Sequence, residues 1–509
     1  MKNIEIKIDA TKQGKVLEHF WSKCVGAGRA NEGLRADWQK QLKMAVKQCG
    51  FEYIRFHGLL CDDMFVYRVE NGIEKYNWQY IDSLFDTLLE IGIKPFVEFG
   101  FMPCEMASGE DTQFWWKGNV TPPIDYDKWG KLLSNAVKHW ISRYGMEEVI
   151  TWYYEIWNEA DLHGFWNGTK SEYFKLYQVS VKAIKEIDER LKVGGPATSN
   201  FVPDERFDGD VEDVTKHITH KINDLDSLEW KGVWIEDFLN YCEENHLPVD
   251  FVSTHPYPTD FALDGQQEMK GRSRSAGSTR DDLTWLKDIV KGSAYQNAEI
   301  HLTEWSSSPT SRDYSHDYLP AANYIIKTNL DCTGLTDSLS YWVFTDIFEE
   351  AGAGPESFHG GFGMITMQGV KKPSFHAYRL LHTLGKEEIA RGEEYIVTKT
   401  TEGKVSALIY NYADDLKQAV PISTYPDHDT AEKIQEMGQE KSINLVITGL
   451  NPRAEIEIEI LDINNGNATK KLREFANNTI LNKCSADNNG ILKINEKLTT
   501  WGIMSIREK

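Results

Sequence analysis

The chain has 509 residues, 41% of them hydrophobic, and a formal net charge of −22. This length exceeds what a single hydrophobic core ordinarily supports, which predicts two domains. The acidic balance argues against a nucleic-acid partner and against an anionic membrane surface, because both need clustered Lys and Arg side chains.

The first residues and the cysteines predict the compartment. Residues 1–15 alternate apolar and polar side chains and lack the apolar core of a signal peptide. The seven cysteines are scattered without metal-ligand spacing, which fits a reducing compartment. No apolar run approaches the roughly 20 residues that span a bilayer. We therefore expect a cytoplasmic protein, with a secreted form whose signal has been removed as the alternative.

Short β-rich runs alternate with amphipathic helical stretches between residues 16 and 385. The predicted strands cover residues 19–28, 51–58, 93–101, 150–159, 191–197, 249–257, 298–305 and 337–346. Helical periodicity covers residues 37–50, 80–92, 125–145, 172–188, 234–246, 281–292, 321–330 and 375–385. Gly50 is a typical residue for the end of the first helix. Eight strand-then-helix units predict a (β/α)8 barrel of the TIM type, an α/β fold, over residues 16–385.

Two polar stretches interrupt this alternation. Residues 200–231 fall between the fifth strand and its helix, and residues 258–280 follow the sixth strand. Long loops on the catalytic face of a barrel usually shape substrate entry, with a solvated surface excursion as the alternative.

The pattern changes to β alternation with turn residues after residue 386. Examples are residues 404–412, 443–450, 454–463 and 491–506. They predict an antiparallel β-sandwich over residues 386–509, an accessory domain. The alternating residues 1–15 are expected to join it.

Polar side chains close most of the predicted barrel strands. The active site of this fold lies at the C-terminal ends of the strands. The residues there are Arg55, His57, Glu98, Asn158, Glu159, His255, Tyr257, Glu304, Trp342 and Asp346. Polar residues where a strand would otherwise be apolar predict a catalytic site.

Glu159 and Glu304 close the fourth and seventh strands, which face each other across a closed barrel. Cleavage of a glycosidic bond needs a carboxylic acid that protonates the leaving oxygen and a carboxylate that attacks. Either glutamate alone is more often half of a structural ion pair. Their neighbours favour catalysis, because Asn158 supplies an amide for a sugar hydroxyl, and Trp157 and Trp305 are expected to form apolar walls.

Arg55 closes the second strand and has two possible roles. It is expected either to keep Glu304 ionised or to form a structural bridge to Glu98. Tyr257 is expected to donate a hydrogen bond that orients Glu304.

Several strings resemble a known family. EIWNEA at residues 155–160 resembles the acid/base motif of glycosidases that carry their two glutamates on strands four and seven. RFHGLLCDD, IKPFVEFGFMP, GNVTPP, VDFVSTHPY, SYWVFTDIFEE and FHGGFG resemble glycoside hydrolase family 39, in particular its bacterial β-xylosidases. The resemblance covers roughly residues 15–385. It implies retention of configuration through a covalent glycosyl-enzyme, with no cofactor and no metal.

Residue by residue, the resemblance implies Glu159 as the acid/base and Glu304 as the nucleophile. It places Asn158 on the 2-hydroxyl of the terminal sugar. The other substrate-binding residues that it implies are His57, His255, Tyr257, Trp342, Glu349 and Glu350. Structural roles for the two histidines, and a solvated loop for the last two glutamates, are the alternatives. A dead-end pocket closed by such residues favours an exo-acting enzyme.

Three positions depart from the family pattern. Ala160 follows the acid/base where Pro is usual, Trp305 follows the nucleophile where Tyr is common, and Phe56 stands where the xylosidases have Gly. The departures bear on the sugar more than on the mechanism.

We expect a retaining exo-β-D-xylosidase that releases xylose from xylo-oligosaccharides. One alternative is the same machinery on a β-glucoside, an α-L-arabinopyranoside or a uronide, for which Arg272, Arg274 and Arg280 would supply a cation. A non-catalytic carbohydrate-binding barrel is the other. A carbohydrate is thus the expected partner, and the accessory sandwich suggests a homo-oligomer by analogy.

Overall fold

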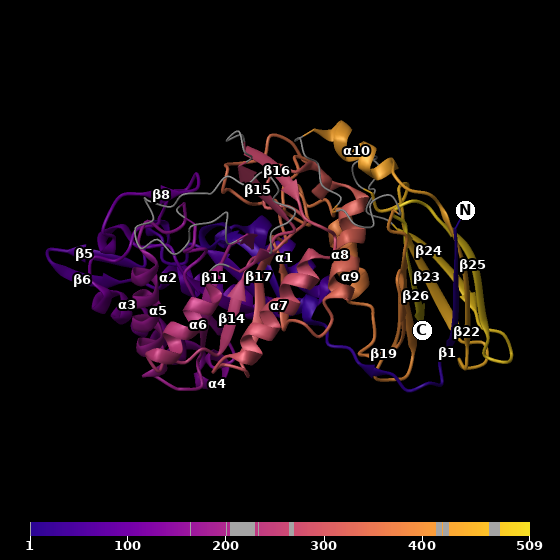
Figure 1. Ribbon diagram of the computed structural model, residues 1–509, viewed down its shortest axis with the longest axis horizontal. Coiled ribbons are helices and arrows are strands. Elements are labelled where there is room, and N and C mark those ends of the chain that lie inside the picture. The colour runs from indigo at the N-terminus through magenta and orange to yellow at the C-terminus, as the bar shows by residue number, and fades with distance from the viewer. Residues whose placement is uncertain are drawn as a thin grey trace.

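A computed structural model describes residues 2–162, 164–199, 201–203, 230–232, 234–263, 269–413, 420, 427–467 and 479–509. Within these ranges it describes the side chains except those of residues 2, 202, 203, 230, 259–263 and 269–273. A barrel and a β-sandwich lie side by side, and both chain ends lie in the sandwich (Figure 1). Among the helices of the described ranges, none is long and apolar enough to cross a membrane.

The eight strands predicted from the sequence form a closed parallel barrel. They are β3 (Cys24–Arg29), β4 (Tyr53–His57), β7 (Lys94–Phe99), β10 (Tyr153–Ile156), β11 (Lys192–Thr198), β14 (Phe251–Thr254), β17 (Glu299–Trp305) and β18 (Ser338–Tyr341). Each pairs in parallel with its neighbours, and β18 closes the barrel on β3. The predicted TIM-type fold is therefore confirmed.

The barrel is surrounded by helices whose apolar faces pack on the strands. They are α1 (Ala36–Cys49), α2 (Gln79–Ile91), α3 (Tyr126–Tyr144), α5 (Lys170–Lys185), α6 (Ile235–Glu244), α7 (Ser278–Gly292), α8 (Leu319–Asp331) and α9 (Pro373–Leu381). Gly50 ends α1 with φ 73°, a left-handed conformation that glycine adopts readily. At the start of α5 the Thr169 hydroxyl accepts from the Glu172 amide at 3.1 Å, and the Glu172 carboxylate accepts from the Thr169 amide at 2.8 Å.

Two sheets form the sandwich. One has the order β2-β19-β20-β21-β26-β23-β24 and the other the order β1-β22-β25. Their bounds are β1 (Lys2–Asp9), β2 (Lys15–Val16), β19 (Glu387–Gly392), β20 (Tyr395–Lys399), β21 (Val405–Tyr410), β22 (Lys441–Thr448), β23 (Glu455–Leu461), β24 (Ile480–Ser485), β25 (Leu492–Leu498) and β26 (Ile503–Glu508). The two sheets enclose a core of their own that includes Ile6, Ile443 and Ile506. Strand β1 lies in this sandwich and pairs with β22 in parallel.

Shorter elements complete the fold. They are β5 (Tyr67–Glu70), β6 (Ile73–Tyr76), β8 (Thr112–Gln113), β9 (Gly118–Asn119), α4 (Met146–Val149), β12 (Val202–Pro203), β13 (Trp230–Lys231), β15 (Thr259–Leu263), β16 (Met269–Ser273) and α10 (His428–Glu436). In the first predicted insertion β12 pairs with β13, and in the second β15 and β16 form a hairpin. Residues 204–229 and 264–268 lie outside the described residues, so the role of both insertions in substrate entry stays a prediction.

Helices α8 and α9 lie between the barrel and the sandwich (Figure 1). Arg379 of α9 donates from both terminal nitrogens to Glu459 of β23, at 3.1 and 2.5 Å. Asn323 of α8 donates to the Trp501 carbonyl. Both groups on α8 and α9 are largely buried. Directional bonds between buried groups fix the sandwich against the helical layer.

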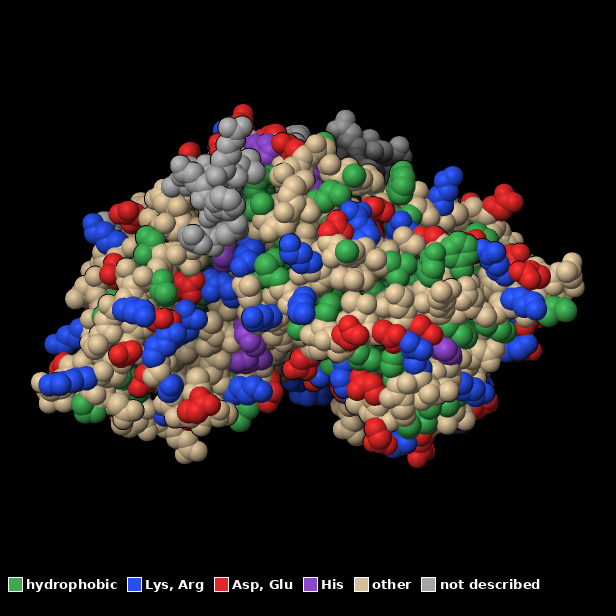
Figure 2. Space-filling view, turned by 180° about the vertical axis from the view of Figure 1, so that it is seen from behind, with side chains coloured by type: hydrophobic (Ala, Val, Ile, Leu, Met, Phe, Trp, Pro, Cys, Tyr) green, Lys and Arg blue, Asp and Glu red, His purple; other side chains and the backbone are tan. Residues whose placement is uncertain are grey.

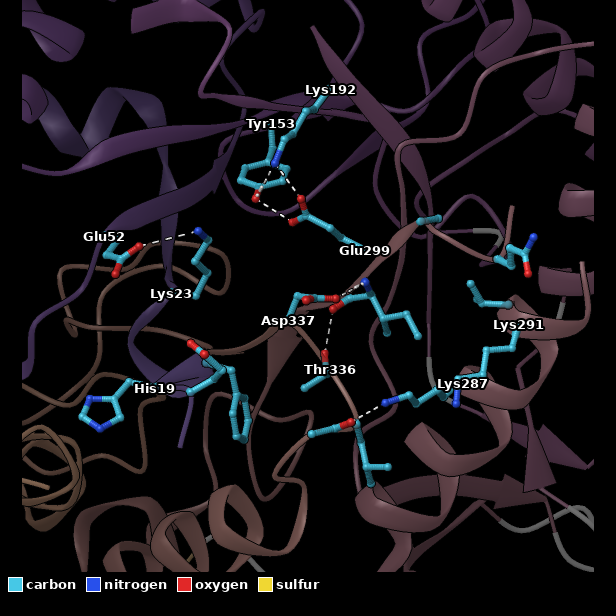
Figure 3. Close-up of a pocket in the computed structure, with 18 of the residues that line it drawn as sticks. His19, Lys23, Glu52, Tyr153, Lys192, Lys287, Lys291, Glu299, Thr336 and Asp337 are labelled. Carbon is cyan, nitrogen blue, oxygen red and sulfur yellow. Dashed lines mark hydrogen bonds and ion pairs between the residues drawn. The ribbon is translucent and has the colours of Figure 1, made fainter. Parts of the chain in front are cut away.

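A cavity of about 620 Å³ opens at the base of the barrel, where the strands begin. Figure 3 shows Lys192, Tyr153 and Glu299 together on one wall and Lys23 facing Glu52 on another. The Lys192 ammonium lies 2.6 Å from the Glu299 carboxylate, and Lys23 lies 3.6 Å from Glu52. Paired charges at this end of a barrel stabilise the fold, whereas active sites of this fold lie at the C-terminal ends of the strands.

Charged side chains of both signs cover the surface. Acidic and basic side chains are intermixed over the face drawn in Figure 2, and the Lys and Arg side chains there do not gather into one basic patch.

Candidate active site

Arg55 lies at the centre of the C-terminal end of the barrel and is fully buried. Its Nη1 donates to Glu304 Oε1 at 2.7 Å, and its Nε donates to Glu155 Oε2 at 2.6 Å. Its Nη2 donates to Asn158 Oδ1 at 2.8 Å and lies 3.0 Å from Glu98 Oε2. The two roles considered for Arg55 are thus combined, since one guanidinium contacts both Glu304 and Glu98.

Glu159 and Glu304 face each other across the barrel mouth. An oxygen of each carboxyl group and a ring nitrogen of His255 all lie within 4.8 Å of one another. Glu159 has φ 47° and Trp157 has φ 72°, uncommon values for non-glycine residues, and this turn after β10 directs Glu159 toward His255. This upper limit lies below the roughly 6.5–9.5 Å between the carboxyl groups of inverting glycosidases, and retaining enzymes are those with the shorter spacing of roughly 5–5.5 Å.

The two glutamates differ in their electrostatic surroundings. Burial raises the pKa of both carboxyl groups. The charges of Glu304 and Asp161 add to the rise at Glu159, so its pKa lies well above the ordinary range. At Glu304 the charges of Arg55 and His57 oppose the rise in pKa. A proton that the pair retains is therefore held by Glu159, while Glu304 is the carboxylate.

The positive charge against these carboxylates comes from the protein itself. Arg55 touches Glu304 directly, and His57 Nε2 lies 3.5 Å from the same oxygen. The arrangement is that of a carboxyl pair in which a guanidinium holds one member.

Tyr257 and His57 fix the nucleophile from two further sides. Tyr257 donates from its hydroxyl to Glu304 Oε2 at 3.2 Å. His57 Nδ1 lies 2.6 Å from Glu98 Oε2, a contact that orients the ring so that Nε2 faces Glu304 and Glu350. Burial raises the pKa of the Tyr257 hydroxyl well above its ordinary range, with the Glu304 charge adding to the rise. Tyr257 therefore stays protonated and acts as a donor.

Trp342 forms an aromatic floor beside these groups. Its ring centroid lies 4.9 Å from that of His57, and the Arg55 guanidinium lies 5.8 Å from the ring. Gly26 of β3 packs beneath it, where a Cβ atom would come within 2.4 Å of the indole. Phe114, in the β8–β9 loop, also stacks on His57, with the two ring centroids 5.8 Å apart. A flat apolar surface of this kind suits the face of a sugar ring.

Glu349 and Glu350 follow β18 and point to different places. Glu350 Oε1 lies 3.7 Å from His57 Nε2, and burial, with the charge of Glu304, raises the pKa of Glu350 well above its ordinary range. Glu349 is held by Arg29 at 3.0 Å and by Arg35 at 3.4 Å. Glu350 thus borders the catalytic pair, and Glu349 belongs to an ion-pair cluster at the rim.

The two tryptophans expected as walls differ in position. Trp305 is buried in the helical layer, where its ring stacks on Tyr324 of α8 and its Nε1 donates to Thr279 of α7. The expectation for Trp305 is therefore wrong. The pairing of β17 with β18 shifts register between Leu302 and Trp305, which places Trp305 on the outside of the barrel. The Trp157 ring centroid lies 6.0 Å from that of Phe101, whose own centroid lies 5.8 Å from that of His57.

Two of the three arginines considered for a uronide pair with aspartates near the start of α7. Arg274 forms two hydrogen bonds with the buried Asp282, at 2.7 and 2.6 Å, and Arg280 pairs with Asp281 at 2.8 Å. The side chain of Arg272 lies outside the described residues. Arg274 and Arg280 therefore form ion pairs with aspartates in the first turns of α7.

Sequence reasoning missed Glu155 and Thr303. Glu155 is fully buried inside β10 and contacts Arg55, and Thr303 is fully buried one residue before Glu304. The Thr303 hydroxyl lies 2.8 Å from both Glu155 Oε1 and His255 Nε2. A charged residue in the middle of the otherwise aromatic and apolar run YYEIW was the available signal for Glu155.

Comparisons with known proteins agree with this geometry. The family model "Glycosyl hydrolases family 39" matches residues 4–222 and 226–486. A β-xylosidase of Caldicellulosiruptor saccharolyticus is 36% identical over 519 residues, covering 100% of this chain and 95% of that protein. A β-xylosidase of Geobacillus stearothermophilus is 40% identical over 399 residues, covering 77% of this chain and 73% of that protein.

A solved structure shares the whole architecture. The crystal structure of a monomeric β-xylosidase from Caulobacter crescentus CB15 superposes with a TM-score of 0.83 at 28% identity, covering 99% of each chain. The likeness therefore extends over both the barrel and the sandwich.

Proposed function

Because the chain belongs to glycosyl hydrolase family 39, we propose that it removes xylose from the non-reducing ends of β-linked xylo-oligosaccharides. The observation that carries the proposal is the close Glu159–Glu304 pair in which only Glu304 touches Arg55. The two curated relatives named β-xylosidases support the choice of sugar. The pair itself supports retention of configuration.

In the first step Glu304 attacks the anomeric carbon and Glu159 gives its proton to the glycosidic oxygen. The bond between the anomeric carbon and that oxygen breaks, the aglycone leaves as an alcohol, and a glycosyl ester forms on Glu304. Arg55 and Tyr257 hold the two carboxylate oxygens before attack, so the nucleophile is oriented without further motion.

In the second step Glu159, now a carboxylate, takes a proton from a water molecule. The oxygen of this water attacks the anomeric carbon, xylose is released and Glu304 is restored as a carboxylate. Two successive inversions give net retention. Both steps require that Glu159 exchange a proton near neutral pH, which the raised pKa of its carboxyl group favours.

The neighbouring side chains supply a binding site for one sugar. Asn158 accepts from Arg55 through Oδ1, which leaves its amide NH2 to donate to the 2-hydroxyl. Trp342 lies under the ring, and His57 and Glu350 bind the hydroxyls at the closed end. His255 holds Glu159 at 3.0 Å, so we assign it to the acid rather than to the sugar.

A panel of 4-nitrophenyl glycosides tests the proposal. We expect the wild-type enzyme to release 4-nitrophenol fastest from the β-D-xyloside, and Glu304→Ala to lose this activity by about 10⁴-fold or more. Glu243→Ala, on the exposed side of α6, is the matched control and should keep wild-type activity. Turnover that survives in Glu304→Ala would contradict the assignment of Glu304 as the nucleophile. Faster release of 4-nitrophenol from the β-glucoside, the arabinopyranoside or the uronide would show that the enzyme prefers that sugar to xylose.

The acid/base role has its own measurement. Glu159→Ala with added azide should form β-xylosyl azide, because azide attacks the glycosyl-enzyme without needing a base. An azide product of inverted configuration, or none at all from an enzyme that still forms the ester, would contradict the assignment.

A further inference from the structure

We propose that Glu155 and Thr303 are positioning residues that fix the tautomer of His255 and thereby keep the catalytic proton on Glu159. The inference deepens the proposed function and rests on it, because it takes Glu159 as the acid. It concerns a chain of three contacts that runs from the barrel interior to the mouth: Glu155 to Thr303, Thr303 to His255, and His255 to Glu159.

The direction of the first contact follows from the chemistry of its partners. Glu155 Oε2 accepts from Arg55 Nε at 2.6 Å, so Glu155 is a carboxylate paired with a guanidinium. A carboxylate only accepts hydrogen bonds. The Thr303 hydroxyl, 2.8 Å from Glu155 Oε1, must therefore donate its single proton there.

The second contact then has one possible direction. Since the proton of Thr303 is committed to Glu155, its oxygen can only accept from His255 Nε2, which lies at 2.8 Å. Burial, followed by the charges of Arg55 and His57, lowers the pKa of His255 well below its ordinary range. The ring is therefore neutral and carries one proton, which is on Nε2.

The third contact places the catalytic proton. A neutral imidazole with its proton on Nε2 has a lone pair on Nδ1, and Nδ1 lies 3.0 Å from Glu159 Oε1. A hydrogen bond in this contact needs a proton on the Glu159 carboxyl group. Bonding to the protonated form disfavours ionisation, so the chain stabilises Glu159 as an acid. The opposite tautomer would donate from Nδ1 and stabilise the carboxylate instead.

Other charged groups also act on Glu159. Glu304 and Asp161 disfavour its ionisation, as does Glu350, whereas Arg55 favours it. His255 and Thr303 come from the ends of β14 and β17 and Glu155 from β10, so the chain crosses the barrel between three strands. Thr303→Val leaves these charges in place, so it changes the tautomer without changing the charge around Glu159.

Thr303 and Glu155 act through His255 and not on the substrate. Both are fully buried, and the contacts that they make lead to Arg55 and to His255. A group that holds an imidazole in one tautomer is known to matter for a catalytic partner beyond it. Here the partner is a carboxylic acid, so the effect is on proton donation and not on nucleophilic attack.

Thr303→Val is the test, because it replaces the hydroxyl by a methyl group of the same shape. The measurement is kcat/KM against pH for two xylosides, phenyl β-D-xyloside, whose leaving group needs protonation, and 2,4-dinitrophenyl β-D-xyloside, whose leaving group does not. We expect a loss of about tenfold or more on the phenyl xyloside and less than about twofold on the dinitrophenyl xyloside. The basic limb of the profile should move to lower pH by about one unit.

Thr303→Ser keeps the hydroxyl and is the matched control. We expect it to keep the wild-type ratio of kcat/KM on the two xylosides and the wild-type position of the basic limb. Glu155→Gln is the second variant. Its amide oxygen can face Arg55 while its NH2 donates to Thr303, which would turn the Thr303 proton toward His255 Nε2 and reverse the tautomer. We expect it to lower the phenyl-to-dinitrophenyl ratio in the same way as Thr303→Val.

Because both rates come from one protein sample, loss of folded enzyme cancels in their ratio. An equal loss on both xylosides, or an unmoved basic limb in Thr303→Val, overturns the inference. Glu159→Ala, measured in the same assay, distinguishes failure of the proposed acid from failure of the positioning role. If Glu159→Ala shows no selectivity for the better leaving group, the proposed acid fails; if it does and Thr303→Val does not, only the positioning role fails.

Discussion

Tyr257→Phe is expected to move one limb of the pH profile and leave the other in place. Tyr257 donates to the nucleophile Glu304 through Oε2 at 3.2 Å and stays protonated. The hydrogen bond stabilises the ionised carboxylate, so its loss should raise the pKa of Glu304. The acid limb of kcat/KM, which reports this carboxylate in the free enzyme, should move to higher pH.

The size of the movement follows from the geometry. Hydrogen bonds to charged groups contribute about 1.5–3 kcal/mol, and 3.2 Å is long for a bond between two oxygens, so the lower end applies. At about 1.4 kcal/mol per pKa unit this corresponds to a shift of about one unit. The basic limb, which reports Glu159, should keep its place because Tyr257 contacts the other glutamate.

The assay is kcat/KM on 4-nitrophenyl β-D-xyloside from pH 4 to pH 9, for wild type and variant. Tyr126→Phe is the control, because Tyr126 donates to a backbone carbonyl on the helical layer, outside the site. A Tyr257→Phe profile that is lowered at every pH without a shift would mean that the hydroxyl binds substrate and does not tune Glu304. A shift of the basic limb would contradict the assignment of the two glutamates.

Three further predictions concern stability. Lys372→Met should lower the free energy of unfolding by about 3–5 kcal/mol in urea titrations, because Asp317 and Asp346, each 2.6 Å from the buried ammonium, would lose their partner; Lys371→Met next to it should cost far less. Burial opposes ionisation of Glu299, but bonds from His301, Lys192 and Tyr153 outweigh it and lower its pKa. Stability from this depressed pKa is present above the unfolded value of about 4.3 and is lost at lower pH, so the melting temperatures of wild type and Glu299→Gln should converge as the pH falls below it. Thr169→Ala should cost about 1 kcal/mol through loss of the α5 cap, whereas Thr169→Ser should be close to wild type.

The barrel was predictable because its signals are local. Each strand is a short apolar run, and each helix carries a 3.6-residue period closed by a residue such as Gly50. Polar residues at strand ends then had to meet at one face, which is why Arg55 and Glu304 could be placed near each other without coordinates. The partner of β1 is set by contacts more than 400 residues away along the chain, and parallel pairing with β22 has no local signature.

The interior of the site was less predictable because it depends on a departure from strand alternation. In a regular strand Thr303 and Glu304 would point to opposite sides. The register shift between Leu302 and Trp305 lets both reach the centre, where Thr303 meets Glu155 and Glu304 meets Arg55. The same shift turns Trp305 outward, which is why its predicted role as a wall was wrong. A bulge of this kind is a property of strand pairing and leaves no mark in the residue pattern.

The charges at the mouth explain why one glutamate is an acid and the other a nucleophile. Glu98, Glu155 and Glu304 share the guanidinium of Arg55. Glu159 contacts the neutral ring of His255 in place of a cation. Ionising Glu159 as well would add an unpaired charge within 4.8 Å of Glu304 in a buried site, which is costly. The free enzyme therefore keeps its proton on Glu159, and attack by Glu304 removes the charge that opposed the loss of this proton, so bond formation and proton transfer assist each other.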